Sequence, residues 1–531
     1  MIPRATLVLT LTMAMVAIGV VRGQETGLDP SFGNSGLVFT DFARAADNAQ
    51  GLAVEPGGTL IAVGFANRPG HSDVAVARYS PDGQLIAAVT IDIHPGEYRN
   101  EGASRVAILP DGRLILGGID QSAHTSTNYD VMLLRLLPTL ALDPSFGTDG
   151  VVITPFSGYG WVTALALEPD GRIILSGAFG LMRYNDNGSL DTTFGAGGRV
   201  APVLSSNEYI TSVAVLGDER ILAVGATFDR GSNEIGLTRF LSNGSVDSSF
   251  GIAGKVLLGD YSAVPYAVAV QTDGRLVAAG GAFVDGGMAD FVVWRFEENG
   301  VLDPSFGTGG RAFADFGGHD SAYALALQTD GRIVAAGQSS QPGNAKSVNF
   351  AVARFEPNGN LDSTFGADGR AVTDFFGEYD LANAVAIQPG RGIVVAGVIG
   401  NPQNGTSDFG LARYDGPPNQ LPVISLPFVS PATLWPPNHR LVVVRVDYDA
   451  IDDRDDSPAC ALSVASNEPI DGAGDGRTAR DWQVIDGHQV RLRSERSATG
   501  KGRIYTITIT CSDSAGLAAQ RQVQVSVPKS R

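Results

Sequence analysis

The sequence predicts an all-β protein: a seven-bladed β-propeller with four-stranded blades, followed by an immunoglobulin-like β-sandwich. Three observations carry this prediction. A set of motifs recurs seven times, short apolar runs alternate with turn clusters rich in the 67 glycines, and the only two cysteines lie in the last quarter of the chain. A chain of 531 residues is too long for one ordinary hydrophobic core, so several domains are expected.

The repeat consists of three motifs in a constant order. An apolar run ending in Gly, such as DGRIVAAG from Asp330, occurs seven times. An alternating run ending in Arg-aromatic, such as Arg354-Phe355, occurs six times, and Arg135-Leu136 is its weak seventh copy. The spacing of the third motif, a hexapeptide, places a degenerate copy near Leu85, where only the preceding turn survives. The complete hexapeptides, of the LDPSFG type, start at Leu28, Leu142, Leu190, Val246, Leu302 and Leu361.

Each unit is expected to form four strands. In unit seven they are Arg370–Phe375, Ala382–Gln388, Ile393–Ala396 and Phe409–Tyr414. Asp-Gly dipeptides before the third strand favour tight hairpins, because Gly adopts positive φ freely. No helical period extends over a dozen residues outside the leader. A single four-stranded sheet cannot bury both of its faces, so seven sheets closed around an axis are favoured over a linear β-solenoid.

The ordered motifs LDxSFGxxG, QxDGRIxxAG and DFxxARF resemble the bacterial delta-60 repeat family over roughly Gly27 to Gly416. The resemblance implies a secreted β-propeller, and it brings no enzymatic activity that can be assigned to particular residues. Unit two departs from the first motif, so its blade is expected to be irregular.

The first 23 residues have the parts of an export signal. Met1–Arg4 is positive, Ala5–Val21 is uncharged, and small residues precede Gln24. A membrane anchor is the alternative, because the uncharged run reaches the lower edge of spanning length. We expect cleavage before Gln24 and a secreted, periplasmic or cell-surface protein without membrane insertion. The net charge of −18 argues against nucleic acid as a partner and leaves a protein or a glycan.

Repetition separates the expected scaffold from the expected site. The Arg of each Arg-aromatic pair is expected to bind the Asp of the hexapeptide, such as Asp303 or Asp362. A ring of seven Arg lining an anion channel is the alternative. The Phe of each hexapeptide is expected to wedge between blades rather than to stack on a ligand. These residues are Phe32, Phe146, Phe194, Phe250, Phe306 and Phe365.

The loops that differ between units are expected to carry any binding surface, together on one face of the ring. They follow the first and third strands of each unit, and unit three has almost no loop between Gly177 and Leu181. Unselected surface loops are the alternative. The loops after the third strands are Phe65–Ser72, Ile119–Tyr129, Ala226–Asn233, Ala282–Ala289, Gln338–Val348 and Val398–Ser407.

No catalytic or cofactor-binding residue is predicted, because the sequence has no zinc-protease, nucleophile-elbow or phosphate-loop motif. Calcium is the one ion considered, since hard carboxylate oxygens gather in two loops. Its candidate ligands are Asp315, His319 and Asp320, or Asp374, Glu378 and Asp380. Three asparagines begin glycosylation sequons, and the first two are also typical turn residues: Asn187, Asn243 and Asn404.

Residues 24–416 are thus assigned to the propeller, 417–422 to a Pro-rich linker and 423–531 to the sandwich. Strings such as LWPPNH from Leu434 resemble Ig-like modules of bacterial extracellular proteins. In an exported protein, Cys460 and Cys511 are expected to form a disulfide. Strands are predicted at Leu441–Asp447, Ala461–Ser466, Gln489–Ser494, Ile504–Cys511 and Arg521–Val527. An acidic turn, with a calcium site as the alternative, comprises Asp449, Asp452, Asp453, Asp455 and Asp456.

These features favour an exported, non-enzymatic binding or scaffold protein that presents variable loops on one propeller face. One alternative is an extracellular hydrolase or lyase that acts on glycans at the central opening of the propeller. The other is a component of a surface assembly.

Overall fold

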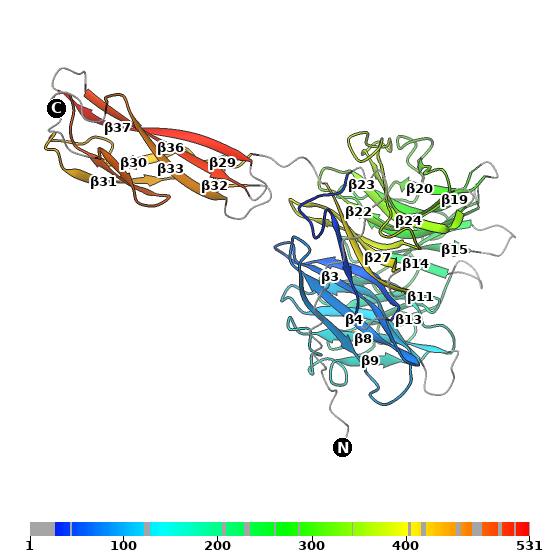
Figure 1. Cartoon of the computed structure of the whole chain (residues 1–531). Coiled ribbons are helices and arrows are strands. Elements are labelled where there is room, and N and C mark those ends of the chain that lie inside the picture. Colours follow the sequence, from blue (N-terminus) through cyan, green and yellow to red (C-terminus); the bar gives the residue numbers. More distant parts are fainter. Residues whose placement is uncertain are drawn as a thin grey trace. The chain divides into compact units, whose positions relative to one another are not determined.

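The computed structural model describes residues 27–42, 45–121, 128–203, 209–227, 234–259, 262–284, 287–341, 344–401, 405–415, 421–452, 458–469, 480–497, 502–513 and 517–529. The chain divides into two compact units, Met1–Asp415 and Gly416–Arg531, which are described separately. The described residues form strands and turns without a helix, which confirms the all-β prediction (Figure 1). Accordingly, they contain no helix with the length and hydropathy needed to cross a membrane. The predicted leader and the sequon at Asn404 lie outside the described residues.

Seven four-stranded antiparallel sheets make up the described part of the first unit, and six of them are formed by consecutive strands. Sheets 1 to 3 comprise β2 (Asp47–Val54), β3 (Leu60–Arg68), β4 (His71–Tyr79) and β5 (Leu85–Ile91); β6 (Glu101–Ile108), β7 (Leu114–Gln121), β8 (Tyr129–Leu136) and β9 (Val151–Thr154); β10 (Val162–Leu167), β11 (Ile173–Gly177), β12 (Gly180–Tyr184) and β13 (Arg199–Val200). Sheets 4 to 6 comprise β14 (Tyr209–Val215), β15 (Ile221–Thr227), β16 (Glu234–Phe240) and β17 (Lys255–Leu258); β18 (Ser262–Val270), β19 (Leu276–Phe283), β20 (Ala289–Phe296) and β21 (Arg311–Ala314); β22 (His319–Leu327), β23 (Ile333–Gln341), β24 (Asn344–Phe355) and β25 (Arg370–Thr373).

Sheet 7 joins the two ends of the unit. Its order is β1-β28-β27-β26, so the N-terminal strand β1 (Leu37–Thr40) completes a sheet made of C-terminal strands. These strands are β26 (Leu381–Gln388), β27 (Gly392–Asn401) and β28 (Thr406–Asp415). The innermost strands are β26 of sheet 7 and the first strand of each of sheets 1 to 6. Each of them contacts the innermost strands of both neighbouring sheets, and β2 contacts β6 and β26. These contacts form a closed cycle of seven innermost strands.

The sheets are offset by one strand from the sequence units. The expected strands of unit seven all exist, but the first of them, β25, is the outermost strand of sheet 6. The strand that follows each hexapeptide therefore pairs with the preceding sheet. Sheet 1, whose hexapeptide is degenerate, has the expected irregularity: the pairing of β4 with β5 shifts register between Arg78 and Tyr79.

Side chains between neighbouring sheets form the core of the first unit. One cluster joins Val277 and Phe291 of sheet 5 to Ile333 and Ala351 of sheet 6, and each of these residues is fully buried. Each sheet thus covers the apolar face of the next, as the repeat predicts.

The second unit has two main sheets over one core. Strands β30, β31, β35 and β34 form one sheet, and β33, β36 and β37 form the other; β29 pairs with β32. The five predicted strands are present, whereas four short ones were not predicted. The bounds are β29 (Val423–Ile424), β30 (Phe428–Ser430), β31 (Leu441–Asp447), β32 (Ala450–Ile451), β33 (Ala459–Ser466), β34 (Trp482–Val484), β35 (Gln489–Arg493), β36 (Gly502–Ser512) and β37 (Ala518–Pro528).

The predicted disulfide between Cys460 and Cys511 is present. The two cysteines face each other on the paired strands β33 and β36 of one sheet. This differs from the arrangement in antibody domains, where the disulfide joins the two sheets.

Candidate functional site

The repeated Arg, Asp and Phe residues form the scaffold between sheets. At each of the six complete hexapeptides, the Nε of the Arg from the preceding unit donates to the Oδ2 of the hexapeptide Asp over 2.7–2.8 Å; for the first hexapeptide this Arg is Arg413 of unit seven. The guanidinium carbon lies 4.5–4.8 Å from the centroid of the Phe ring. The trios are Arg413-Asp29-Phe32, Arg135-Asp143-Phe146, Arg183-Asp191-Phe194, Arg239-Asp247-Phe250, Arg295-Asp303-Phe306 and Arg354-Asp362-Phe365.

These trios also connect neighbouring sheets. Arg239 of sheet 4 donates through Nη1 to the carbonyl of Glu298, in the turn after β20 of sheet 5, over 2.8 Å. Hydrogen bonds from Ser249 and Arg239 hold the pKa of Asp247 at about 2, so the ion pair persists at neutral pH. Arg78, which precedes the degenerate copy near Leu85, binds Glu55 instead, over 2.7 Å. The predicted ion pairing is therefore present, and these buried arginines do not line an anion channel.

The variable connections lie on one face of the ring, here called the variable face. It carries the hairpins between the second and third strands of each sheet and the segments that lead to the next innermost strand. Several predicted loops are largely strand: β3 extends to Arg68 and β4 begins at His71, within the predicted loop Phe65–Ser72. In sheet 3, residues 178–179 connect β11 and β12, and both of these strands are only five residues long. The other five predicted loops lie partly outside the described residues: Ile119–Tyr129, Ala226–Asn233, Ala282–Ala289, Gln338–Val348 and Val398–Ser407.

A pocket of about 290 Å³ lies on the variable face over sheets 1 to 3 and is here called the aromatic pocket. Tyr129 of β8 and Tyr159, just before β10, stack with ring centroids 5.6 Å apart and planes inclined by 23°. Phe65 and Trp161 add two further rings to its wall. The polar side chains of the lining are Gln50, Asn67, Ser72, Asn100 and Glu101.

The aromatic pocket adjoins a smaller cavity among the innermost strands. This cavity has a volume of about 170 Å³ and shares Gln50 and Trp161 with the aromatic pocket. Arg105, three tyrosines, two threonines and Asn383 line the rest of it, and none of the described residues in this lining is an acid or a histidine. Burial lowers the pKa of Arg105 to about 10, so the side chain stays cationic at neutral pH.

A β-bulge interrupts the innermost strand of every sheet and aims side chains at its neighbours. Four of the bulged residues donate to a backbone carbonyl of the next innermost strand over 2.6–2.8 Å. They are Ser104, Thr163, Thr211 and Asn383. The bulges thus fasten the inner ring, while the remaining bulged residues Gln50, Tyr266 and Tyr323 line the cavity.

Carboxyl groups gather where neighbouring sheets meet on the variable face. Between sheets 5 and 6, one oxygen each of Asp290, Asp315 and Asp320 lie within 4.8 Å of one another. Between sheets 7 and 1, Asp408, Asp41 and Asp47 occupy the equivalent places and form the same kind of group. Two further groups lie around sheets 1 and 2: His71, Asp73 and Asp92, and His94, Glu101 and Asp120.

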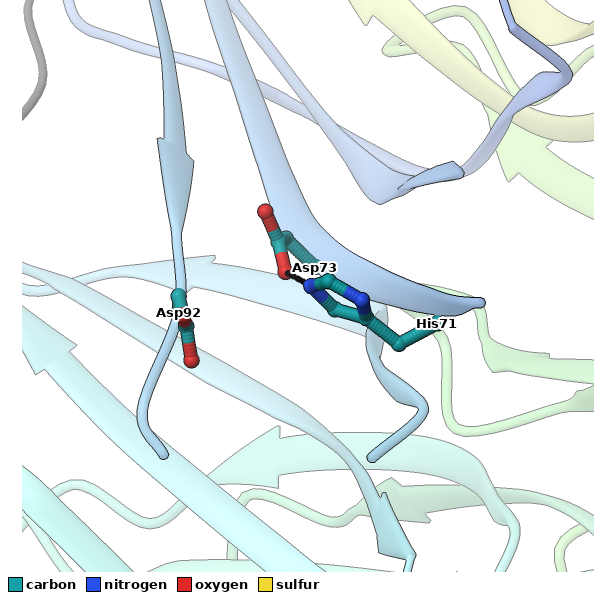
Figure 2. Close-up of side chains that lie close together, drawn as sticks. All are labelled: His71, Asp73 and Asp92. Atoms are coloured by element: carbon teal, nitrogen blue, oxygen red, sulfur yellow. Dashed lines mark ion pairs between the residues drawn. The ribbon is translucent and has the colours of Figure 1, made fainter. Parts of the chain in front are cut away.

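The group around His71 is already paired within the protein. His71 Nε2 lies 3.2 Å from Asp73 Oδ1, and Arg68 Nε lies 3.1 Å from Asp73 Oδ2. Figure 2 shows His71 turned toward Asp73 on the same strand, with Asp92 at the end of the neighbouring strand. Likewise, His94 Nε2 lies 3.1 Å from Asp120 Oδ2. Arg68 in the first group, and Arg99 in the second, whose Nη1 lies 3.9 Å from Asp120 Oδ2, thus bring positive charge to these carboxylates.

The sequence identified only part of these groups. Asp315 and Asp320 were predicted ligands, but their third partner is Asp290, whereas the His319 ring packs against Phe283 with centroids 5.8 Å apart. The signal for Asp290 was its position five residues before the repeated Arg295, which Asp408 shares relative to Arg413.

The other predicted acidic and turn residues have different outcomes. Asp374, Glu378 and Asp380 do not form a group of this kind among the described residues. Asn187 and Asn243 each accept hydrogen bonds from a serine two residues on, which confirms them as turn residues. In the C-terminal acidic turn, Asp453, Asp455 and Asp456 lie outside the described residues, while Asp449 and Asp452 lie inside them.

Comparison with known proteins identifies the class of fold. Five segments, residues 109–146, 168–194, 216–250, 271–306 and 328–365, match a family model described as a domain of unknown function (DUF5122) beta-propeller. The chain therefore carries β-propeller repeats. A comparison with curated protein sequences finds no match.

Several solved structures resemble the chain at the level of the fold. PorZ, a surface component of the type-IX secretion system of Porphyromonas gingivalis, is 12% identical with a TM-score of 0.37, and the match covers 89% of this chain but only 58% of PorZ. Sqt1 from Chaetomium thermophilum is 14% identical with a TM-score of 0.39, covering 71% and 98% of the two chains. A gluconolactonase from Xanthomonas campestris is 12% identical with a TM-score of 0.30, covering 57% and 90%. Similarity at this level gives no information about ligands.

Proposed function

We propose that the protein is an exported, non-enzymatic binding protein whose aromatic pocket takes up a carbohydrate. In this proposal the seven sheets are the blades of a seven-bladed propeller of the delta-60 type, residues 1–23 direct export, and the second unit is an Ig-like spacer or attachment module. The disulfide between Cys460 and Cys511 supports export, because disulfides persist in oxidising compartments.

The observation that carries the proposal is the chemistry of the aromatic pocket. Its rings come from three different sheets and do not belong to the three repeated motifs, so the scaffold does not require them. Aromatic faces pack against the C–H surfaces of a sugar ring, and the side chains of Asn67, Asn100 and Glu101 can exchange hydrogen bonds with hydroxyl groups. The pocket is concave and has a volume of about 290 Å³, so it can hold one or two sugar residues, whereas a flat protein surface would not fill it.

The test is a glycan array followed by calorimetric titration of the best ligand. We expect Tyr159→Ala to weaken binding at least tenfold. The Tyr159 ring stacks on Tyr129, and Tyr159 is 63% exposed, so the ring is accessible to a ligand. Tyr379→Ala is the matched control: Tyr379 has the same place before the innermost strand of sheet 7, is also exposed, and lies outside the pocket. Equal affinities of both variants and the parent would refute a carbohydrate site here.

The alternative proposal is a glycan hydrolase or lyase. Among the described residues that line the pocket, its support is the carboxyl group of Glu101, whereas the described lining of the cavity among the innermost strands holds no acid and no histidine. Release of new reducing ends or unsaturated sugars from the bound glycan, lost in Glu101→Gln, would favour this alternative. Binding without turnover would favour the binding protein.

A further inference from the structure

The junction between sheets 5 and 6 brings three carboxyl groups together. Asp290 lies on β20, Asp320 on β22, and Asp315 on the segment between β21 and β22. The Oδ2 atom of Asp320 accepts a hydrogen bond from the backbone N–H of Phe316 over 2.8 Å, which fixes the orientation of the carboxyl group. One oxygen from each of the three lies within 4.8 Å of the others, a spacing that a single cation can bridge.

The protein satisfies this group only in part. Asp320 is fully buried, and its Oδ1 atom has no hydrogen-bond partner. A buried carboxyl oxygen without a partner costs free energy, so a ligand is expected for it. Burial and the neighbouring charges of Asp315 and Asp320 also raise the pKa of Asp290 to about 6. In contrast to the group around His71, no ion pair with Lys, Arg or His reaches these three residues in the described part of the chain.

The same arrangement recurs at the junction that closes the ring. Asp408 of β28, Asp41 after β1 and Asp47 of β2 are the equivalents of Asp290, Asp315 and Asp320. Asp47 is fully buried, its Oδ2 accepts from the backbone N–H of Phe42 over 2.7 Å, and its Oδ1 has no hydrogen-bond partner.

The scaffold does not require these acids. Between sheets 2 and 3, Asp130 keeps the first position, but Pro155 and Gly160 replace the other two. There Asp130 Oδ1 accepts the backbone N–H of Phe156 over 2.9 Å, so one carboxyl group orders the segment without a cluster. Three acids at a junction therefore exceed what the joining of two sheets demands.

We propose that Ca²⁺ binds at these two junctions, held by Asp290, Asp315 and Asp320 at one and by Asp408, Asp41 and Asp47 at the other. Ca²⁺ prefers hard oxygen ligands and tolerates irregular geometry, whereas Mg²⁺ demands near-octahedral sites. Each ion joins two neighbouring sheets. The ion at the second junction joins N-terminal to C-terminal segments, so it also stabilises the closed ring.

Titration calorimetry and thermal unfolding of the mature chain test the proposal, with CaCl₂, MgCl₂ or EDTA as the only additions. We expect binding of Ca²⁺ at two sites and a Tm that is several degrees higher in millimolar Ca²⁺ than in EDTA, because an ion bound only to the folded state stabilises it. Absence of binding heat together with an unchanged Tm would overturn the proposal. An equal response to Mg²⁺ would overturn the assignment to Ca²⁺.

Substitutions locate the sites. Asp290→Asn is expected to remove one of the two sites, Asp408→Asn the other, and Asp130→Asn neither. In EDTA the Tm of Asp290→Asn should be no lower than that of the parent, because the change relieves repulsion between carboxylates. The exposed Asp315→Asn serves as a second variant if Asp290→Asn does not fold. Retention of both sites in Asp290→Asn and in Asp315→Asn would refute this location.

Discussion

At the scale of single residues, Glu101 illustrates how the fold controls protonation. Its side chain is 2% exposed in the wall of the aromatic pocket, and Oε2 accepts the backbone N–H of Ile93 over 2.9 Å. Burial, together with the charges of Asp92, Asp120 and Asp73, raises the pKa of Glu101 from 4.5 to about 9. The group is thus protonated at neutral pH in the folded protein and ionised in the unfolded chain.

This difference predicts a pH dependence of stability. A raised pKa in the folded state contributes stability that is fully present below about pH 4.5 and is lost as the pH rises toward 9. The amide side chain that Glu101→Gln introduces cannot ionise. The free energy of unfolding of the parent should therefore fall relative to that of the variant as the pH rises from 5 to 9. Urea unfolding at several pH values measures this difference. Parallel pH profiles of the two proteins would contradict the raised pKa.

At the scale of elements, strands were easier to predict than their partners. Alternation and turn residues located the strands of each unit, because both signals are local. The assignment of strands to sheets does not depend on local sequence. Whether β25 pairs with β24 of its own sheet or lies beside β26 depends on packing between units. Strands of two or three residues, such as β29 and β34, are too short to show a period. The complete acid groups were not predicted for a related reason. Asp290 and Asp315 lie on different elements, and the sequence does not show that these elements meet.

The disulfide gives a prediction at the same scale. It joins paired strands of one sheet across a sequence separation of 51 residues. Loss of such a cross-link costs about 3 to 4 kcal/mol, mainly by freeing the unfolded chain. We expect the double variant Cys460→Ser/Cys511→Ser to lower the unfolding transition of the second unit in calorimetry and to leave that of the first unchanged. An equal shift of both transitions would show that the two units unfold together.

At the scale of the whole ring, the closure is the one place where the repeat does not follow the chain. Six sheets are built from consecutive strands, whereas sheet 7 depends on β1, which is paired with β28 from Leu37↔Ala412 to Thr40↔Phe409. The ion pair of Asp29 with Arg413 spans the same closure over a sequence separation of 384 residues. Its equivalents inside the ring, such as Arg295 with Asp303, span only 8. The chemistry is the same, but only the closure pair holds distant segments together.

Comparison of Asp29→Asn with Asp303→Asn isolates the effect of closure. Both variants weaken a buried ion pair of 2.7–2.8 Å, and both Asp residues accept hydrogen bonds from a serine two residues on. Loss of the charge should destabilise each locally. In Asp29→Asn the released segment is the N-terminal end, so β1 can detach from β28 while the other six sheets stay folded. Hydrogen exchange should therefore accelerate over residues 37–40 in Asp29→Asn and remain slow there in Asp303→Asn. If both variants expose β1 equally, the ring opens as a single unit and the closure is no weaker than any other junction.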